Sequence, residues 1–339
     1  MTSATPSRTP ARRTLIGAAL ATLLAGGLLT TAQPARAQAD AFPSKMITLV
    51  APFPPGGATD VLTRKIGEKL QKLLGQSVIV ENRAGAGGTL AAAHVAKAPA
   101  DGHTLLMGVT GTNAISGSLY RKLPFDPATA FAPVSLIVTA PLVLLPRPEL
   151  PTKTFADYVK AAKAKPDALS YASPGNGTTM HLAGAMLAAE TGTSLLHVPY
   201  KGSGPALQNL MGNQVDSMFA DLMQVLPQIR SGDLKAIAVT SKQRHPLLPD
   251  VPTVAESGFA GFEALSWHAL FAPAGTPPAV VEKLHGAVAQ ALKEPDMQKH
   301  FESLGLVIEG RTPAQTQAFV QEEIRKWGRI VKQTGVSQD

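Results

Sequence analysis

Short apolar runs alternate with helical patterns along the chain from residue 46 onwards. Residues 47–51 (ITLVA) form an apolar run of strand length, and further strands are predicted at 77–80 and 104–109. Between the first two runs, apolar residues recur at helical spacing, at Val61, Leu62, Ile66, Leu70 and Leu73. An alanine-rich helix is predicted at 89–97. This alternation predicts a parallel sheet covered by helices on both faces.

A second set of similar units follows the proline-rich stretch 141–151. A helix is predicted at 154–163. Short strands are predicted at 169–172, 195–198, 215–220 and 236–240. Two α/β domains are therefore expected.

The last quarter of the chain has a different pattern. A strand is expected at 267–272, and no strand is expected after Ala272. Three helices follow, at 278–292, 296–304 and 313–331. These helices must dock on a sheet that the earlier part of the chain has formed.

We expect the chain to cross twice between two lobes, near 132–139 and near 263–272. Lobe 2 then comprises 139–263, and lobe 1 comprises 40–138 together with 264–339. Each lobe is expected to be a mainly parallel sheet flanked by helices. Two crossings make a hinge beside a ligand cleft, a geometry that closes around ligands.

Residues 1–39 have the pattern of a secretory signal peptide. Arginines at positions 8, 12 and 13 precede an uncharged stretch, 15–32, and small-residue cleavage patterns follow at 35–37 and 37–39. A membrane anchor is the alternative, because the stretch approaches bilayer-spanning length, although Gly26, Gly27 and three threonines dilute it. Residues 12–16 (RRTLI) also have twin-arginine form, so general secretory and twin-arginine export both remain open.

Removal of this segment changes the charge of the chain. The whole chain carries 31 Lys and Arg against 24 Asp and Glu, a net charge of +7. Four of the arginines and no acidic residue precede Asp40, so the net charge of the remainder is about +3. A mildly positive surface suits anionic solutes, and no basic stripe with interleaved aromatic residues points to nucleic acid. The absence of cysteine excludes disulfides, thiolate catalysis and cysteine metal sites.

The segment 51–60 (APFPPGGATD) joins the first strand to the first helix. Gly56 and Gly57 let the backbone approach a solute closely, and the helix N-terminus offers unpaired N–H groups. These features predict an anion site made of main chain at the carboxyl end of a strand. The alternative is an ordinary strand-to-helix turn with Thr59 or Asp60 as N-cap.

The arrangement recurs at 171–181 (YASPGNGTTMH), again a strand, a turn of small residues and a helix. Ser173, Asn176, Thr178 and Thr179 add neutral hydrogen-bonding groups. We therefore expect two helix N-termini, one per lobe, to face each other across the cleft and hold a carboxylate.

Two further candidates follow strands, at 110–113 and 219–221. Asp221 has two open roles: it accepts a hydrogen bond from an ammonium or hydroxyl of the ligand, or it caps the next segment. Arg83 is expected to pair with Glu81 or a nearby loop, and Tyr200 is expected to pack. No phosphate-binding loop, dinucleotide fingerprint, zinc-protease motif or serine elbow is present, so no enzyme, cofactor or metal site is expected.

Six segments together resemble the substrate-binding receptors of tripartite tricarboxylate transporters, also called Bug-type receptors. They are PFPPGGATD (52–60), VENRAGAGGT (80–89), DGHTLLMG (101–108), HVPYKGSGPA (197–206), LPDVPTVAESG (248–258) and LFAPAGTP (270–277). The resemblance implies a monomeric, periplasmic two-lobed binding protein that delivers a small carboxylate to two integral membrane subunits, one large and one small. A dicarboxylate, a tricarboxylate, an amino acid and an aromatic acid all remain open as ligand, and so does a sensing role with a signalling receptor.

Carried over by position, the resemblance implies ligand contacts in both loops and at the variable strand ends. Gly56 joins this set on the chemistry of the first loop. The expected ligand-binding residues are Phe53, Gly56, Gly57, Thr59, Asp60, Thr110, Asn113, Ser173, Asn176, Gly177, Thr178, Thr179, Ala220 and Asp221.

Cleavage at either small-residue pattern predicts a mature N-terminus within residues 38–41. Mass spectrometry of the exported protein should find this terminus and no peptide from the arginine-rich segment. A periplasmic protein that retains Arg12 and Arg13 would contradict export by cleavage.

Overall fold

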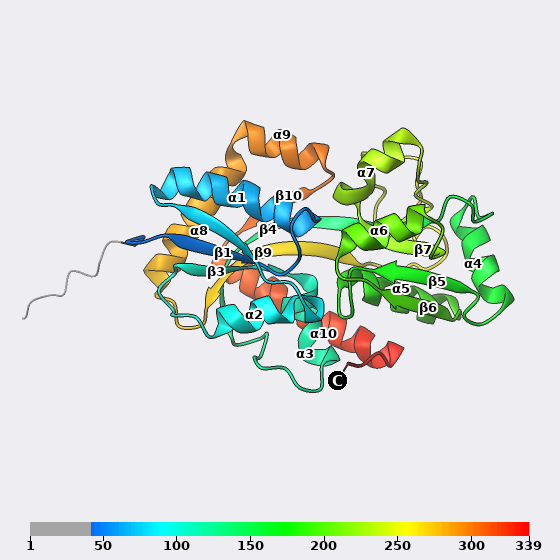
Figure 1. Cartoon of the computed structure of the whole chain (residues 1–339), viewed down its shortest axis with the longest axis horizontal. Helices are drawn as coiled ribbons and strands as arrows, with labels where there is room; N and C mark the ends of the chain where they lie inside the picture. The colour runs from blue at the N-terminus through cyan, green and yellow to red at the C-terminus, as the bar shows by residue number, and fades with distance from the viewer. Residues whose placement is uncertain (1–41, 339) are drawn as a thin grey trace, which may run out of the picture. The chain divides into compact units, whose positions relative to one another are not determined.

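The computed structural model describes residues 42–338 (Figure 1). The predicted signal peptide and its cleavage sites lie outside the described residues. The first elements are β1 (Ile47–Ala51), α1 (Ala58–Leu74), β2 (Val78–Asn82), the short helix η1 (Ala86–Gly88), α2 (Thr89–Ala96), β3 (Thr104–Val109), the π-helical turn η2 (Gly111–Ile115) and α3 (Ser116–Leu119).

The middle of the chain repeats the alternation of strands and helices. Its elements are β4 (Phe131–Pro146), α4 (Phe155–Ala164), β5 (Leu169–Ser173), α5 (Thr179–Thr191), β6 (Leu195–Pro199), α6 (Ser203–Met211), β7 (Ser217–Asp221), α7 (Leu222–Ser231) and β8 (Ala238–Val239). The last elements are β9 (Leu265–Pro273), α8 (Pro278–Lys293), α9 (Pro295–Ser303), β10 (Val307–Arg311) and α10 (Pro313–Thr334). The strands and helices predicted from the alternation are confirmed to within about three residues at each end.

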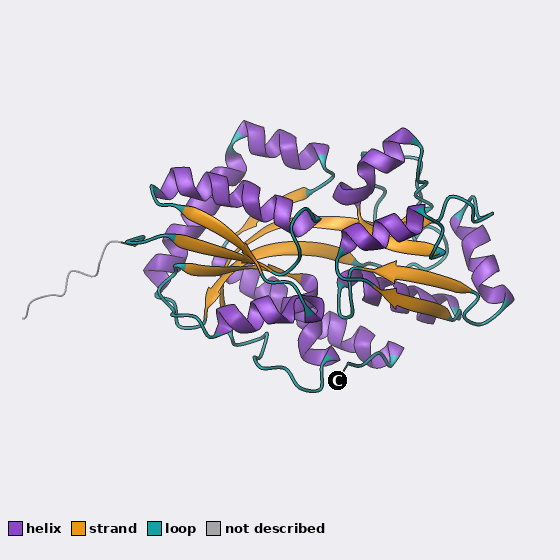
Figure 2. Ribbon diagram, viewed as in Figure 1, coloured by secondary structure: helices purple, strands orange, loops and turns teal. Residues whose placement is uncertain are grey.

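The sheet is mixed rather than fully parallel (Figure 2). Its strand order is β2-β1-β3-β9-β4-β7-β5-β6, and β8 and β10 also pair with β4. The predicted parallel pairing holds at both ends, where β1 is parallel to β2 and β3, and β5 is parallel to β6 and β7. In the centre, β4 and β9 run antiparallel to their neighbours.

The central strand β4 differs from the prediction most clearly. No strand was predicted over the expected crossing at 132–139 or the proline-rich stretch 141–151, but residues 131–146 form one strand. Its prolines are tolerated because each lies where a ladder bond is not required. Pro133 precedes a register shift, and Pro141 is the last residue paired with β9 before Leu142 begins to pair with β7.

The prediction of no strand after Ala272 was wrong. β10 pairs antiparallel with β4, with Ile308 opposite Val138 and a register shift before Arg311. The segment Val307–Arg311 was missed because Glu309, Gly310 and Arg311 interrupt its apolar pattern.

Helices cover both faces of the sheet (Figure 1). Around the first strand group, which we define as β1, β2, β3, β9 and β10, helices α1, α8 and α9 pack on one face and α2, α3 and α10 on the other. Around the second strand group, β5 to β8, helices α6 and α7 cover one face and α4 and α5 the other. Strand β4 serves both groups, and its residues alternate between the two layers, Leu142 and Leu144 facing one and Val143 and Leu145 the other.

The three predicted C-terminal helices are confirmed, and α8 and α10 dock on a strand formed earlier in the chain, whereas α9 contacts α8 and β10. Helix α8 contacts α1 and β4, whereas α10 contacts β4, α3 and η2 and also reaches α5. Residues 42–338 belong to one contact unit, so the predicted lobe boundaries remain a prediction. Within this part of the chain, no helix has the length and apolarity needed to cross a bilayer.

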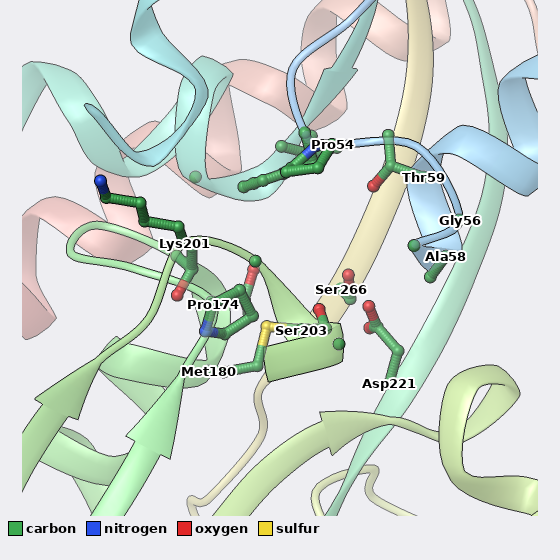
Figure 3. Close-up of a pocket in the computed structure, with 18 of the residues that line it drawn as sticks. Pro54, Gly56, Ala58, Thr59, Pro174, Met180, Lys201, Ser203, Asp221 and Ser266 are labelled. Carbon is green, nitrogen blue, oxygen red and sulfur yellow. The ribbon is translucent and has the colours of Figure 1, made fainter. Parts of the chain in front are cut away.

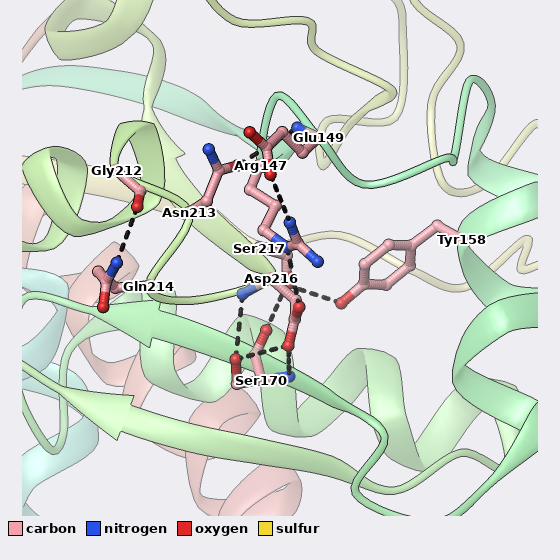
Figure 4. A network of polar contacts seen from close by, with 9 residues as sticks. All are labelled: Arg147, Glu149, Tyr158, Ser170, Gly212, Asn213, Gln214, Asp216 and Ser217. Carbon is pink, nitrogen blue, oxygen red and sulfur yellow. Dashed lines mark hydrogen bonds and ion pairs between the residues drawn. The ribbon is translucent and has the colours of Figure 1, made fainter.

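A polar network joins the strand ends of the second group that lie away from the first group (Figure 4). The Asp216 carboxylate accepts hydrogen bonds from the Ser170 N–H and hydroxyl, both at 2.8 Å, and from the Arg147 guanidinium at 3.1 Å. The Tyr158 hydroxyl lies 2.8 Å from that of Ser217. Burial alone would raise the pKa of Asp216, but the bonds from Ser170 and Arg147 lower it below its ordinary value.

Asp216→Asn should destabilise the protein at neutral pH by roughly 1–2 kcal/mol, because the charge-assisted bonds are lost from a partly exposed side chain. A lowered folded pKa gives stability that is present above the unfolded pKa and is lost as pH falls through the folded value. The difference between wild type and variant should therefore shrink below about pH 4. Urea unfolding at several pH values measures this difference in the free energy of unfolding. Asp250→Asn, a substitution at an exposed position, is the control. A difference that grows in acid would contradict the assignment.

Candidate functional site

A cavity of about 180 Å³ lies between the two strand groups, at the carboxyl ends of β1, β3, β5, β6 and β7 (Figure 3). An enclosed space of this size suits a small solute. The segments that precede α1, α5, α6 and α7 line it, together with β9. The cavity therefore occupies the position expected for a ligand of an α/β sheet.

The loop before α1 is shaped by glycine and by Asp60. Gly56 has φ +84°, in the left-handed region that favours glycine. The Asp60 carboxylate accepts the Gly56 N–H at 2.9 Å, and it also receives bonds from Arg64 and Asn82. Burial alone would raise the pKa of Asp60, but these bonds lower it. Asp60 therefore holds the loop and does not line the cavity.

The N-cap of α1 is Gly57, in extended conformation and without a side-chain cap, so the alternative of Thr59 or Asp60 as N-cap was wrong. The first intrahelical bond runs from the Val61 N–H to the Gly57 carbonyl. The N–H groups of Ala58 and Thr59, which line the cavity, therefore have no partner within the helix.

The second predicted turn supplies another helix N-terminus. Thr178 caps α5 by accepting the His181 N–H, which leaves the N–H groups of Thr179 and Met180 without a partner in the helix. Thr178, Thr179 and Met180 all line the cavity.

Two predicted residues of this turn have structural partners instead. The Ser173 hydroxyl lies 2.6 Å from Nε2 of His197, whose ring stacks on that of His181 at 3.9 Å. Burial lowers the pKa of His181 to about 4 and that of His197, together with the neighbouring His181, to about 3, so both rings are neutral near pH 7. Asn176 donates to Gln338 at the edge of an adjoining groove. Ser173 and Asn176 support the turn and do not line the cavity.

A third helix N-terminus, that of α6, was missed by the sequence analysis. Gly202 is its N-cap, and Ser203 and Gly204 begin the helix at the cavity wall. Its sequence has the same pattern as 51–60 and 171–181, which is a strand (here β6), a turn of small residues and a helix, and this pattern could have revealed it. Lys201 also lines the cavity, with an exposed side chain. Three positive helix ends therefore converge on one small volume, which favours an anion.

Four other predicted residues lie behind the cavity wall. The Thr110 hydroxyl accepts the Trp267 N–H at 3.0 Å, and Asn113 bonds to Thr112. Ala220 is fully buried within β7. Gly177 does not line the cavity, but its carbonyl lies so close to Gly111 that a Cβ on Gly111 would approach it to 2.7 Å. Half of the predicted ligand-binding residues therefore line the cavity, and the other half do not. Those that line it are Phe53, Gly56, Gly57, Thr59, Thr178, Thr179 and Asp221.

Asp221 lies at the N-cap position of α7, but its side chain makes no cap hydrogen bond. The capping alternative raised by the sequence is therefore wrong. The side chain is 5% exposed, its Oδ1 has no hydrogen-bond partner, and the carboxylate turns toward Ser266 (Figure 3). Burial raises the pKa of Asp221 to about 6, opposed by a hydrogen bond from Ser266.

His268 and Ser266 complete this side of the cavity, and both were missed by the sequence analysis. They are polar residues at alternate positions of an otherwise apolar strand, β9, which was an available indication. His268 Nε2 lies 3.0 Å from the Thr59 hydroxyl, and its Nδ1 has no partner. Burial lowers the pKa of His268 to about 4, so the ring is neutral near pH 7.

Two side chains that were expected to have structural roles, Arg83 and Tyr200, lie outside the cavity. Arg83 pairs with Glu81 at 2.7 Å, as expected. Tyr200 packs at the edge of a hydrophobic cluster and also lines the adjoining groove. Within residues 42–338, no group of three or more His, Asp or Glu side chains is placed to hold a metal ion.

Comparison with known proteins gives consistent matches. Residues 62–336 match the family model described as the tripartite tricarboxylate transporter family receptor. Rpa4515 of R. palustris, solved with adipate, is 36% identical, with a TM-score of 0.84 over 87% of this chain and 99% of its own. The periplasmic binding protein BugD is 38% identical, with a TM-score of 0.83 over 88% and 100%.

MatC from Rhodopseudomonas palustris, solved with bound malate, is 39% identical, with a TM-score of 0.82 over 86% of this chain and 100% of its own. These likenesses confirm the α/β periplasmic-binding-protein fold.

The raised pKa of Asp221 predicts a specific pH dependence of stability in the ligand-free protein. A carboxyl whose folded pKa is about 6 against 3.8 unfolded gives stability that is present below about pH 4 and is lost as pH rises through 6. Asp221→Asn does not lose this stability. Its free energy of unfolding should therefore exceed that of wild type by an amount that grows as pH rises from 4 through 6 and then levels at about 3 kcal/mol. Chemical unfolding at intervals of pH measures the difference. A gap that is constant with pH would contradict the assignment.

Proposed function

The chain belongs to the family of tripartite tricarboxylate transporter receptors, as its motifs indicated, and on this premise we propose that it captures a small carboxylate in the periplasm for a membrane transporter of two integral subunits. Members of the family are periplasmic binding proteins, and related structures hold adipate or malate. A carboxylate ligand is thus supported by relatives as well as by the site. The chain acts in this proposal by binding and release, without catalysis.

The observation that carries the proposal is the convergence of the α1, α5 and α6 N-termini on one cavity. Each N-terminus carries a partial positive charge and N–H groups that the helix itself cannot pair. A carboxylate there gains several charge-assisted hydrogen bonds. The anion is held mainly by main chain, through the loops at Gly57 and Thr179 and the start of α6.

We further infer that the two predicted lobes, 40–138 with 264–339 and 139–263, close around the solute. β4 and β9 lie where the chain passes between them, so bending of these two strands would open the cavity. Gly111 of the predicted lobe 1 meets Gly177 of the predicted lobe 2 beside the cavity, and Gly87 meets Asn176, in both cases with no space for a Cβ. Such close backbone contacts belong to a closed arrangement.

Native mass spectrometry of freshly purified protein tests the capture of a carboxylate. We expect a retained small acid, released on denaturation and identified by its mass. A protein that carries no solute and whose melting temperature does not rise with any carboxylate would contradict the proposal.

The main-chain site predicts which variants matter. Gly57 has backbone angles open to any residue, and its added Cβ would meet only the Pro54 carbonyl, at 3.8 Å, so Gly57→Val should fold. Its side chain would stand where the solute approaches, and the loss of two charge-assisted bonds at roughly 1.5–3 kcal/mol each would weaken binding about a hundredfold or more. Lys201→Ala should weaken binding less, because the ammonium is exposed.

Calorimetry with the retained acid compares the two variants. Gly286→Ala, on α8 with no atom within 4 Å of the added Cβ, is the control for substitution of a glycine. Binding that is lost in Lys201→Ala and normal in Gly57→Val would contradict a main-chain anion site.

A further inference from the structure

The cavity has two chemically different sides. The helix N-termini of α1, α5 and α6 present N–H donors and positive partial charge. The other side, which we call the acceptor wall, consists of Asp221, Ser266 and His268. Lys201 is the single Lys or Arg side chain among the described residues that line this cavity, and it extends away from Asp221 (Figure 3).

The acceptor wall is built by two strands that flank β4. Ser266 of β9 pairs with Ala140, and Asp221 at the end of β7 pairs with Leu142 two residues further along β4. The carboxylate of Asp221 faces the Ser266 side chain (Figure 3). Backbone pairing therefore places the two residues side by side before any solute binds.

Two observations indicate that the wall is built for a ligand. Asp221 stands where an aspartate would normally cap α7 and stabilise it by about 1 kcal/mol, yet it makes no cap bond. Oδ1 of Asp221 and Nδ1 of His268 both lack a hydrogen-bond partner. A buried carboxylate without full partners is costly, and such groups are kept where they serve a function.

The charges of the wall determine what it accepts. His268 contributes no positive charge near pH 7, since its ring is neutral, and Ser266 is uncharged. An ionised Asp221 attracts an ammonium and accepts a hydrogen bond from a hydroxyl. A second ligand carboxylate at the same place would face a like charge in a poorly solvated cavity, which is unfavourable.

We propose that Asp221, with Ser266 and His268, makes this receptor selective for a carboxylate that bears a hydroxyl or an ammonium at its far end, and that it disfavours dicarboxylates. The inference rests on the proposed function, because it assumes that the ligand carboxylate occupies the helix N-termini. It separates this chain from its relatives solved with adipate and malate, since both of those ligands carry two carboxyl groups.

Calorimetry at pH 8 with two matched series of acids tests the selectivity. The four-carbon series is butanoate, 4-hydroxybutanoate, 4-aminobutanoate and succinate, and the six-carbon series is hexanoate, 6-hydroxyhexanoate, 6-aminohexanoate and adipate. In the series that fits better, we expect the hydroxy or the amino acid to bind at least about tenfold more tightly than the dicarboxylate and the unsubstituted acid. The two donor-bearing acids together show whether the wall prefers a neutral or a cationic donor.

Asp221→Asn keeps the shape and one acceptor oxygen of the side chain but removes the charge. The variant should bind the dicarboxylate about tenfold or more tightly than wild type does, and it should bind the amino acid about tenfold or more weakly. Affinity for the hydroxy acid should change less. Asp250→Asn, an exposed change of the same chemistry outside the cavity, should leave all affinities unchanged.

Each result decides a different claim. A wild-type protein that prefers the dicarboxylate at pH 8, or a ranking that Asp221→Asn leaves unchanged, would overturn the selectivity and leave the carboxylate receptor standing. Failure of every acid in both series to bind would overturn this inference, whereas the proposed function fails only if the protein retains no solute and no carboxylate raises its melting temperature.

Discussion

The N–H groups that helices leave unpaired at their first turn are the constraint on which the site depends. In most helices a side chain or water satisfies them. Here α1 begins at Gly57 and α6 at Gly202, neither of which has a side chain to provide a cap, and both helices open on the same cavity. The missing caps leave donors directed into the cavity, and in the proposed function the three positive helix ends bind the carboxylate without a dedicated arginine.

Strand β4 makes this convergence possible. Because β4 pairs with β9 along its first part and with β7 along its second, it joins the two strand groups through one continuous backbone. The pairing of β4 changes from β9 to β7 between Pro141 and Leu142, beside Asp221 and Ser266 of the acceptor wall. A change in the angle between the strand groups would therefore alter the distance between the helix N-termini and the acceptor wall.

Local rules predicted the two loops and most elements, since apolar periodicity and glycine-rich turns act over a few residues. Strand β4 was not predicted because its prolines indicate a loop unless the partner change at Pro141 is known. Asp60 was predicted as a ligand contact, and the sequence does not show that Arg64 and Asn82 already bind its carboxylate. Ser266 and His268 reach the site through antiparallel pairing between distant segments, which single-sequence patterns do not specify.

The position of the ligand carboxylate is the most direct test of a receptor whose anion site is main chain. A crystal structure of the protein with its retained solute measures it. The account predicts carboxylate oxygens within hydrogen-bond distance of N–H groups at the starts of α1, α5 and α6, such as those of Ala58, Thr179 and Ser203. A carboxylate bound only by Lys201, or a solute in the separate groove beside His245, would contradict it.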